Sequence, residues 1–438
     1  MKEIFKKISP ELILLFSFLL AIFIGAILLK LPFATPHGIK FIDALFTSTS
    51  AVCVTGLIVV DTGKDFTFWG QLIILFLIQI GGLGIMTFSV FFLIFLKEKI
   101  PLNAKVAIAS TLSKDFFDLK KLILNIFVVT LIVELSGALM LFVYFYNNQF
   151  DFLKSLFYAL FHSISAFCNA GFALFSNNLV DYQSSWYVNL IIMFLIVAGG
   201  IGFTVYLDIK NKRLSLHSKI VLSVTGCLIF IGALLIFLLE YQNALKGLPF
   251  NIKVLASLFQ SVTPRTAGFN TLDLTKFKDV TIVIIMLLMF IGASPGSCGG
   301  GVKTTTFIIF IMTIFSTAKG KDYITIFKRT ISKEVIFKSF AIILIAITFL
   351  LLGIIGLSLC DNTPMDRGDF LSYTFEAFSA IGTVGLSLGY TQKLTVVGKV
   401  IIILLMFLGR VGPLTLVLAL RGKKRVNLKF AEENIMIG

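Results

Sequence analysis

Four glycines of this sequence follow short apolar segments that contain serine or threonine. Glycine adopts positive φ without a steric penalty, so the carbonyl groups beside it can turn toward one point. Converging carbonyl dipoles replace the hydration shell of a weakly hydrated monovalent cation. These backbone stretches are therefore a candidate cation site, built from four tripeptides: Val54-Thr55-Gly56, Asn169-Ala170-Gly171, Thr266-Ala267-Gly268 and Thr383-Val384-Gly385.

The spacing around these glycines indicates copies of one unit. A phenylalanine precedes the glycine by ten positions at Phe46, Phe161 and Phe375, and by nine positions at Phe259. Glycine-rich motifs then recur downstream at 81–84, 199–202 and 409–412. Self-similarity of this kind is typical of a repeated supersecondary unit.

The elements that position these stretches are apolar enough to lie in a membrane. Hydrophobic residues make up 57% of the 438 residues, charged residues 14%, and the mean hydropathy is +0.98. A soluble domain is nearer half apolar and one quarter charged. Several charge-free runs reach the roughly 18 residues that cross a bilayer as a helix; they include 12–29, 68–96, 186–207 and 339–359. We expect the first run to be a retained membrane helix, because it shows no small-residue cleavage site.

Each glycine stretch lies between two such runs and is too short to cross the membrane, which predicts a re-entrant half-helix and loop. We therefore expect an all-α membrane protein with four pseudo-symmetric repeats, each a helix, a pore helix and a second helix. Eight membrane spans and four re-entrant loops would surround one central pore. The predicted boundaries are 1–121, 122–216, 217–332 and 333–420, followed by a basic tail at 421–438.

The distribution of charge predicts the orientation of the spans. Polar segments taken alternately along the chain form two sets, one with 24 lysines and arginines against 10 acidic residues, the other with 12 of each. Excess positive charge marks the cytoplasmic side, so we expect both termini in the cytoplasm and the protein in the cytoplasmic (inner) membrane. Orientation explains the net charge of +15, and no nucleic-acid partner is expected.

The third repeat departs from the others within its second span. Residues 292–302 contain several glycines and a proline, which interrupt helices. Non-helical backbone at membrane depth is tolerated only inside protein or beside a water-filled cavity. We interpret the segment 292–302 as a mobile gating loop beneath the candidate cation site, which would act as an ion filter. A static kink is the alternative. The gate residues would be Gly292, Gly296, Gly299, Gly300, Gly301, Lys303 and Arg410.

Charged residues inside the apolar segments need partners. Arg410 lies at the centre of the last run, where a charge costs about 2.5–3.5 kcal/mol on insertion scales. We expect it to hydrogen-bond carbonyls of the gating loop or to form a positive barrier below the filter. Lys303 could reach the gate or the cytoplasmic interface, and Glu134 could pair with Arg410. Glu376 is more simply a hydrogen-bonded carboxylate than a source of negative field.

Two motifs in the same loop imitate enzyme signatures. Residues 292–296 match the hydrolase pattern G-x-S-x-G around Ser294, and 296–304 nearly match a phosphate-binding loop, but no strand precedes either. An intramembrane hydrolase at Ser294 is therefore the weaker, competing function. Five cysteines and three histidines show no paired spacing, so we expect no cofactor and no enzymatic activity.

Three segments carry a resemblance to a known family: Ser50–Leu57 with Val60–Gly63, Arg265–Thr271 and Gly409–Thr415. The chain resembles the bacterial potassium-uptake family that includes KtrB and TrkH, with fungal and plant relatives. Its first span begins near residue 12, as in the KtrB type. The resemblance implies K⁺ as the transported ion at the filter carbonyls, because all four filter positions are glycine where some sodium-selective plant members have serine. A sodium-selective or sodium-coupled transporter, with Na⁺ as coupling ion, is the alternative.

The resemblance also implies partners. It predicts a homodimer in membrane lipid, seated on a cytoplasmic nucleotide-binding ring of the KtrA type. The basic segments 97–121 and 316–338 and the tail from Arg421 to Lys429 are plausible docking surfaces. A membrane-surface anchor is the simpler role for the tail. The resemblance assigns gating to the loop at 292–302.

Overall fold

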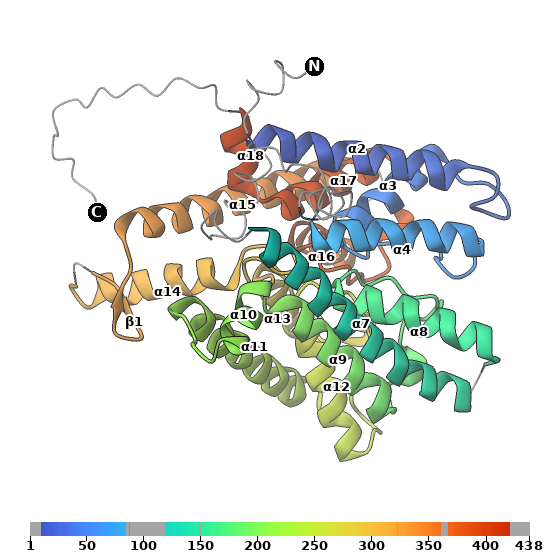
Figure 1. Cartoon of the computed structure of the whole chain (residues 1–438), viewed down its shortest axis with the longest axis horizontal. Helices are drawn as coiled ribbons and strands as arrows, with labels where there is room; N and C mark the ends of the chain where they lie inside the picture. The colour runs from blue at the N-terminus through green and yellow to red at the C-terminus, as the bar shows by residue number, and fades with distance from the viewer. Residues whose placement is uncertain are drawn as a thin grey trace.

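The computed structural model describes residues 10–84, 87, 119–148, 150–321, 323–360 and 367–420. Within these residues the protein is largely α-helical, as predicted (Figure 1). Four of the described helices are long and apolar enough to cross a membrane by length and composition. They are α2 (Pro10–Lys30), α7 (Leu119–Asn148), α11 (Leu216–Glu240) and α15 (Lys333–Cys360).

A shorter helix follows each long helix and packs against it. These helices are α3 (Phe41–Val52), α8 (Phe152–Phe167), α12 (Phe250–Val262) and α16 (Arg367–Gly382). The polar side chains of α3 are buried in protein: Thr47 donates to Asp43 O, and Ser48 donates to Ile22 O of α2. Each stretch that the sequence predicts to re-enter the membrane therefore contains a short helix followed by non-helical backbone.

A third helix completes each unit: α4 (Phe68–Leu83), α9 (Trp186–Gly200), α13 (Asp279–Phe290) and α17 (Val396–Val411). Three of these helices begin after a hydroxyl cap. The side chains of Thr67, Ser185 and Thr395 each accept a hydrogen bond from the amide three residues later. Such caps satisfy amides that have no partner within the helix, so the same residue type starts the third helix in three of the four units.

These third helices are interrupted at a shared position, which corrects the expectation that the third repeat alone is broken. Gly84, Gly202 and Gly412 have φ of +83°, +91° and +93°, a conformation that other L-residues adopt only at a cost. The last glycine of each glycine-rich motif therefore lies at the end of a helix (Gly84 and Gly412) or one residue after its C-cap (Gly202). In the third unit, residues 291–303 separate α13 from α14 (Thr304–Ala318).

The chain beyond each interruption differs between the units. The predicted span 186–207 bends by 92° between α9 and α10 (Phe203–Lys210). The predicted span 400–420 divides into α17 and α18 (Pro413–Leu420). Of the predicted span 68–96, residues 85, 86 and 88–96 lie outside the described part, as do 97–118 and the tail 421–438.

The remaining elements are short. Strands β1 (Thr325–Ile326) and β2 (Arg329–Thr330) pair antiparallel, with Thr325 opposite Thr330, between α14 and α15. This hairpin is a small departure from an all-α fold. The 3-10 segments among the described residues occupy loops; they are η2 (Val180–Tyr182), η3 (Leu274–Lys276) and η4 (Thr391–Lys393).

The four units contact one another in chain order, and the last unit contacts the first, so that they form a closed cycle. The third helix of each unit packs against the short helix of the next: α4 on α8, α9 on α12, α13 on α16, and α17 on α3. The last unit thus meets the first, although they are far apart in sequence. The four short helices are enclosed by this cycle, and the largest apolar core surrounds them.

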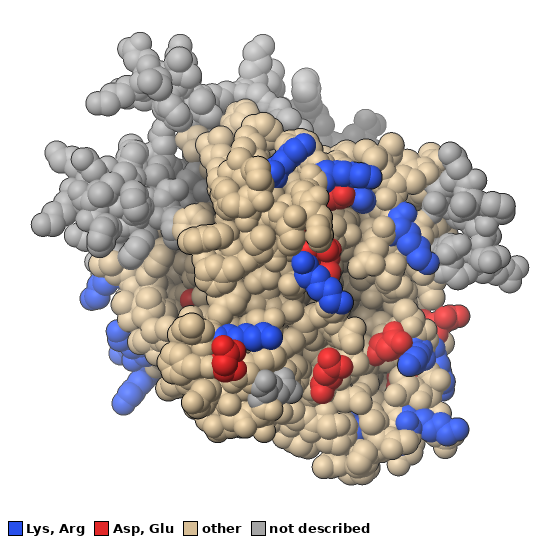
Figure 2. Space-filling model, turned by 90° about the vertical axis from the view of Figure 1, so that its right-hand side faces the viewer, with Lys and Arg blue, Asp and Glu red and all other residues tan. Residues whose placement is uncertain are grey.

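Charge is sparse and mixed on the face that carries the loop joining α2 to α3 (right side of Figure 1). Figure 2 turns this face to the viewer and shows basic and acidic side chains interspersed on an otherwise uncharged surface. This mixture agrees with the balanced set of polar segments in the sequence, which includes residues 30–67.

Candidate functional site

The four glycines of the candidate cation site, Gly56, Gly171, Gly268 and Gly385, meet in a ring. A methyl group at Gly56 would lie 3.0 Å from Gly171 Cα, one at Gly171 would lie 2.9 Å from Gly268 Cα, and one at Gly385 would lie 3.0 Å from Gly56 Cα. A methyl at Gly268 would lie 3.2 Å from Gly385 Cα. We call this arrangement the glycine ring; it has no room for any side chain.

Backbone carbonyls approach the glycine ring from all four units. Each ring glycine faces the carbonyl oxygen of the residue before the next ring glycine; in order, these oxygens belong to Ala170, Ala267, Val384 and Thr55. Each short helix ends within about two turns of its ring glycine, and the C-terminal end of a helix carries partial negative charge. Both features favour a cation at this point.

The residues two positions before the ring glycines are held in strained backbone. Val54, Asn169, Thr266 and Thr383 have φ of +56°, +59°, +69° and +49°. This region is unfavourable for any side chain and most unfavourable for β-branched ones, so the surrounding structure must impose it. The sequence places these residues in the site but does not predict their conformation, because no local motif requires it.

The side chains at this level are not equivalent. The side-chain amide of Asn169 and the hydroxyl of Thr266 lie 3.2 Å apart, in either orientation of the amide. Within the described residues, the buried hydroxyl of Thr383 has no protein partner, nor has that of Thr55, one position nearer the ring. The ring is therefore fourfold in its backbone and asymmetric in its side chains.

The interrupted segment 291–303 packs directly against this level. A methyl at Gly299 would collide with Thr266 Oγ1, and one at Gly300 would collide with Thr383 Oγ1. The segment is closed on itself by a hydrogen bond from Gly292 N to Val302 O at 2.8 Å. Its glycines allow the backbone to lie against two of the strained residues, which a bulkier sequence would prevent.

Arg410 and Lys303 hold this segment through backbone carbonyls. Arg410 donates to Cys298 O in the segment and to Gly81 O at the end of α4. Lys303 Nζ donates to Gly299 O at 2.7 Å. The expected bond from Arg410 to the loop is present, and Arg410 lies in the last turn of α17.

Glu134 and Glu376, both buried, have other partners. Glu134 accepts from Gln79 Nε2 at 3.2 Å, whereas Arg410 is engaged with carbonyls. Glu376 accepts from the hydroxyls of Ser387 and Thr391 at 2.5 and 2.6 Å. Glu376 is thus a hydrogen-bonded carboxylate that fixes the chain after Gly385, as the simpler interpretation predicted.

Ser294 has the environment of a structural residue. Its hydroxyl is buried and lies 3.1 Å from Thr304 Oγ1. His162 is engaged elsewhere, with Nδ1 2.7 Å from Tyr158 O and Nε2 3.2 Å from the amide of Leu174. In the part of the chain that the structure describes, the Ser294 hydroxyl is bonded to another hydroxyl and not to a base, so the hydrolase interpretation has no support here.

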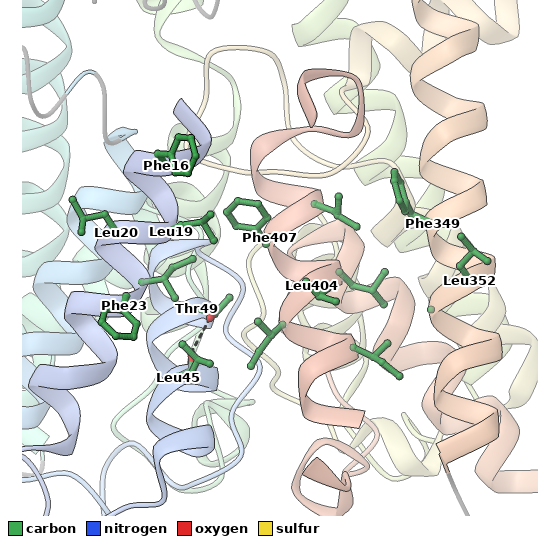
Figure 3. Close-up of a pocket in the computed structure, with 16 residues that line it drawn as sticks. Phe16, Leu19, Leu20, Phe23, Leu45, Thr49, Phe349, Leu352, Leu404 and Phe407 are labelled. Atoms are coloured by element: carbon green, nitrogen blue, oxygen red, sulfur yellow. Dashed lines mark hydrogen bonds between the residues drawn. The ribbon is translucent and has the colours of Figure 1, made fainter. Parts of the chain in front are cut away.

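An apolar groove lies away from the glycine ring. It has a volume of about 1020 Å³ between α2 and α3 on one side and α15 and α17 on the other (Figure 3). Phe16, Phe23, Phe349 and Phe407 line it together with aliphatic side chains. Its polar lining residue is Thr49, whose hydroxyl donates to Leu45 O at 2.8 Å. This groove offers no free group to coordinate a cation.

The fold is that of a membrane transport protein. It is similar to the crystal structure of the potassium transporter TrkH from Vibrio parahaemolyticus, with a TM-score of 0.72, 19% sequence identity, and coverage of 92% of this chain and 84% of that chain. The model of the TrkH family, described as cation transport protein, matches residues 12–426. The chain therefore belongs to the TrkH family of cation transport proteins, which are not enzymes.

Two relatives align with almost the whole chain. The Ktr system potassium uptake protein B of Bacillus subtilis (strain 168) is 43% identical, with 99% of this chain and 97% of that protein covered. The potassium/sodium uptake protein NtpJ of Enterococcus hirae is 38% identical, with 100% of this chain and 99% of that protein covered.

Proposed function

We propose that this chain takes up K⁺ across the cytoplasmic membrane as the translocating subunit of a Ktr-like system. The observation that carries the proposal is the glycine ring, where each of the four glycines faces a carbonyl oxygen of a neighbouring unit. Carbonyls in this arrangement replace the water of a weakly hydrated cation. The B. subtilis relative named as a potassium uptake protein supports K⁺ as the ion.

The proposed filter consists of the ring glycines and the two residues before each of them. Its entrance faces outward, and ions move down the inside-negative potential, which supplies about 2.3 kcal/mol per charge per 100 mV. The proposed topology has eight crossings, four re-entrant loops and cytoplasmic termini, and the charge asymmetry of the polar segments supports its orientation. The cyclic packing of the four units supports one pore at their centre.

The proposed gate is the segment 292–302, with Lys303 and Arg410 holding it. Glycines 299 and 300 lie against the side chains of Thr266 and Thr383, so the segment would block an ion leaving the filter. Release requires the segment to move aside, which breaks the bonds from Arg410 and Lys303 to its carbonyls. The same bonds would hold the gate closed at rest.

The proposed assembly is a homodimer on a cytoplasmic nucleotide-binding ring of the KtrA type. The B. subtilis relative is named as part of a Ktr system, which supports a partner subunit. Docking through the basic segments 97–121 and 316–338 and the tail from Arg421 to Lys429 remains a prediction from charge. Within 316–338, Lys328 and Arg329 lie at the exposed β1–β2 hairpin.

Replacement of Gly385 by serine tests the filter. Gly385 has φ of +93° and its added side chain would collide with Thr55 O, so K⁺ uptake into liposomes should fall by about tenfold or more, or lose selectivity over Na⁺. Gly389 is a matched control, since its φ is +84° but no atom lies within 4 Å of an added methyl. Wild-type selectivity in Gly385→Ser would refute the filter assignment.

A sodium-selective or sodium-coupled transporter is the second candidate, favoured by the E. hirae relative that is named for both ions. The same liposomes distinguish the candidates. K⁺ uptake that is independent of Na⁺ supports the first, whereas uptake of Na⁺ alone, or K⁺ uptake only with Na⁺ present, supports the second.

A further inference from the structure

Each unit carries one hydroxyl residue, in or directly after its short helix, that is bonded to the loop behind the glycine ring. The four residues are Ser50, Ser165, Thr263 and Ser379, and all are fully buried. Their carbonyl oxygens accept from the amide of the residue before the ring glycine, at 2.8, 2.7, 2.9 and 2.8 Å in chain order. We call these four the clamp residues.

The hydroxyl of each clamp residue makes a second bond to the same loop. In the first and fourth units, Ser50 and Ser379 accept from the amide of the ring glycine, both at 3.0 Å. In the second and third units, Ser165 and Thr263 donate to the carbonyl of the residue after the ring glycine, at 2.7 Å for Ser165. A hydroxyl group donates and accepts, so one side-chain type serves both patterns.

The third unit shows that the bonding pattern is kept when the spacing changes. Its loop is one residue shorter, so Thr263 precedes its ring glycine by five positions where the other clamp residues precede theirs by six. Thr263 still bonds the loop through both its carbonyl and its hydroxyl. The bonds to the loop are therefore the shared feature of the four units.

We propose that the clamp residues are positioning residues that set the spacing of the ring carbonyls and thereby the preference for K⁺ over the smaller Na⁺. The inference rests on the proposed function of the ring as a filter. A buried amide or carbonyl that loses its partner shifts to find another. A loop freed in this way lets the carbonyls close around a smaller ion, which lowers selectivity without stopping transport.

The chain contains matched controls for this inference. Ser48, Ser163 and Ser261 lie two positions before the clamp residues of the first three units and are buried like them. Their hydroxyls donate away from the ring, to carbonyls of the preceding long helix, at 2.7, 2.6 and 2.7 Å. They share side-chain chemistry, location and burial with the clamp residues and differ in the bonded partner.

The experiment compares Ser50→Ala and Ser165→Ala with Ser48→Ala and Ser163→Ala in the full-length protein reconstituted in liposomes. The ratio of K⁺ to Na⁺ uptake should fall about three- to tenfold in the clamp variants, the loss expected for one buried hydrogen bond. The KM for K⁺ should rise while the maximal rate is kept. In the control variants, the ratio of K⁺ to Na⁺ uptake should stay within about twofold of wild type. Ser165→Thr should keep the wild-type ratio, because the hydroxyl of Thr263 makes the same bond in the third unit.

Wild-type selectivity in Ser165→Ala would overturn the inference. An equal loss of selectivity in Ser163→Ala would also overturn it, since helix packing and not the clamp would then set selectivity. If Ser165→Ala does not yield a monodisperse protein, Ser379→Ala decides by the same criteria. Absence of K⁺ uptake by the wild-type protein would instead contradict the proposed function, so the two failures are distinguishable.

Discussion

Arg410 shows how a single charged residue joins distant segments of an apolar chain. Its guanidinium donates to Cys298 O in the interrupted segment and to Gly81 O at the end of α4. A guanidinium presents several donors in a rigid plane, so one side chain can bond two carbonyls at once. Arg410 therefore restrains the segment 291–303 against the first unit.

Replacement of Arg410 by glutamine should raise K⁺ uptake several-fold at saturating K⁺. The variant removes the charge-assisted bonds to Cys298 O, Gly81 O and Gly82 O, each contributing about 1.5–3 kcal/mol, and so favours the displaced segment. Ion flux into liposomes measures the effect.

The Arg410→Lys variant separates bonding from charge. Lysine keeps the positive charge but lacks the rigid fork, so uptake should also rise if the bonds hold the gate. Wild-type uptake in Arg410→Lys would show that Arg410 acts as an electrostatic barrier, and unchanged uptake in Arg410→Gln would contradict both roles.

At the level of elements, the glycines at the ends of the third helices have similar backbone conformations but different surroundings. Gly84, Gly202 and Gly412 all have φ between +83° and +93°. A methyl at Gly84 would lie 3.8 Å from Thr87 Oγ1, and one at Gly412 would lie 3.7 Å from Thr415 Oγ1. At Gly202, it would lie 2.6 Å from Pro295 O of the interrupted segment.

Alanine at these three positions should therefore have unequal effects. Gly84→Ala and Gly412→Ala should each lower the free energy of unfolding by about 1–2 kcal/mol, the cost of left-handed backbone for an L-residue. Gly202→Ala should cost more and should also alter K⁺ uptake, because its methyl displaces the segment that contains Pro295. Thermal unfolding in detergent and liposome flux measure the two effects; equal losses at the three sites would contradict this expectation.

For the whole molecule, the contact between the last and the first unit closes the cycle. Lys399 at the start of α17 bonds Asp43 at the start of α3, with Nζ and Oδ1 2.6 Å apart. The two side chains are 15% and 11% exposed, so the pair is largely shielded from water. This ion pair joins residues 356 positions apart and holds the fourth unit against the first.

Breaking this ion pair should destabilise the protein. Asp43→Asn or Lys399→Met should lower the free energy of unfolding by about 3–5 kcal/mol, because each leaves one buried charge unpaired. The double variant should recover much of that loss, which a thermal double-mutant cycle measures.

The exposed pair Glu334–Lys338, with side chains 75% and 60% exposed, is the control. Glu334→Gln should have little effect, since water screens an exposed pair. Additive losses in the double variant would show that Asp43 and Lys399 do not couple.

The repeated organisation could be predicted from sequence because it depends on local composition. Charge-free runs, Ser and Thr near each ring glycine and the spacing from Phe46 to Gly56 are properties of neighbouring residues. The interruptions at Gly202 and Gly412 could not be placed with the same certainty, because glycine permits positive φ without requiring it. The same glycine-rich sequence at 199–202 could either pack one helix against another or end a helix, so the sequence does not distinguish the two roles.

Hydropathy and spacing along the chain were enough to predict the membrane class, the repeated pattern and the glycines that form the ring. They could not predict which carbonyl faces which glycine, that Arg410 bonds Cys298, or that Lys399 pairs with Asp43. These contacts join residues from different units, so their distances are set by how the four units pack in a cycle. No local pattern records that packing, whereas every unit needs the same local pattern to form.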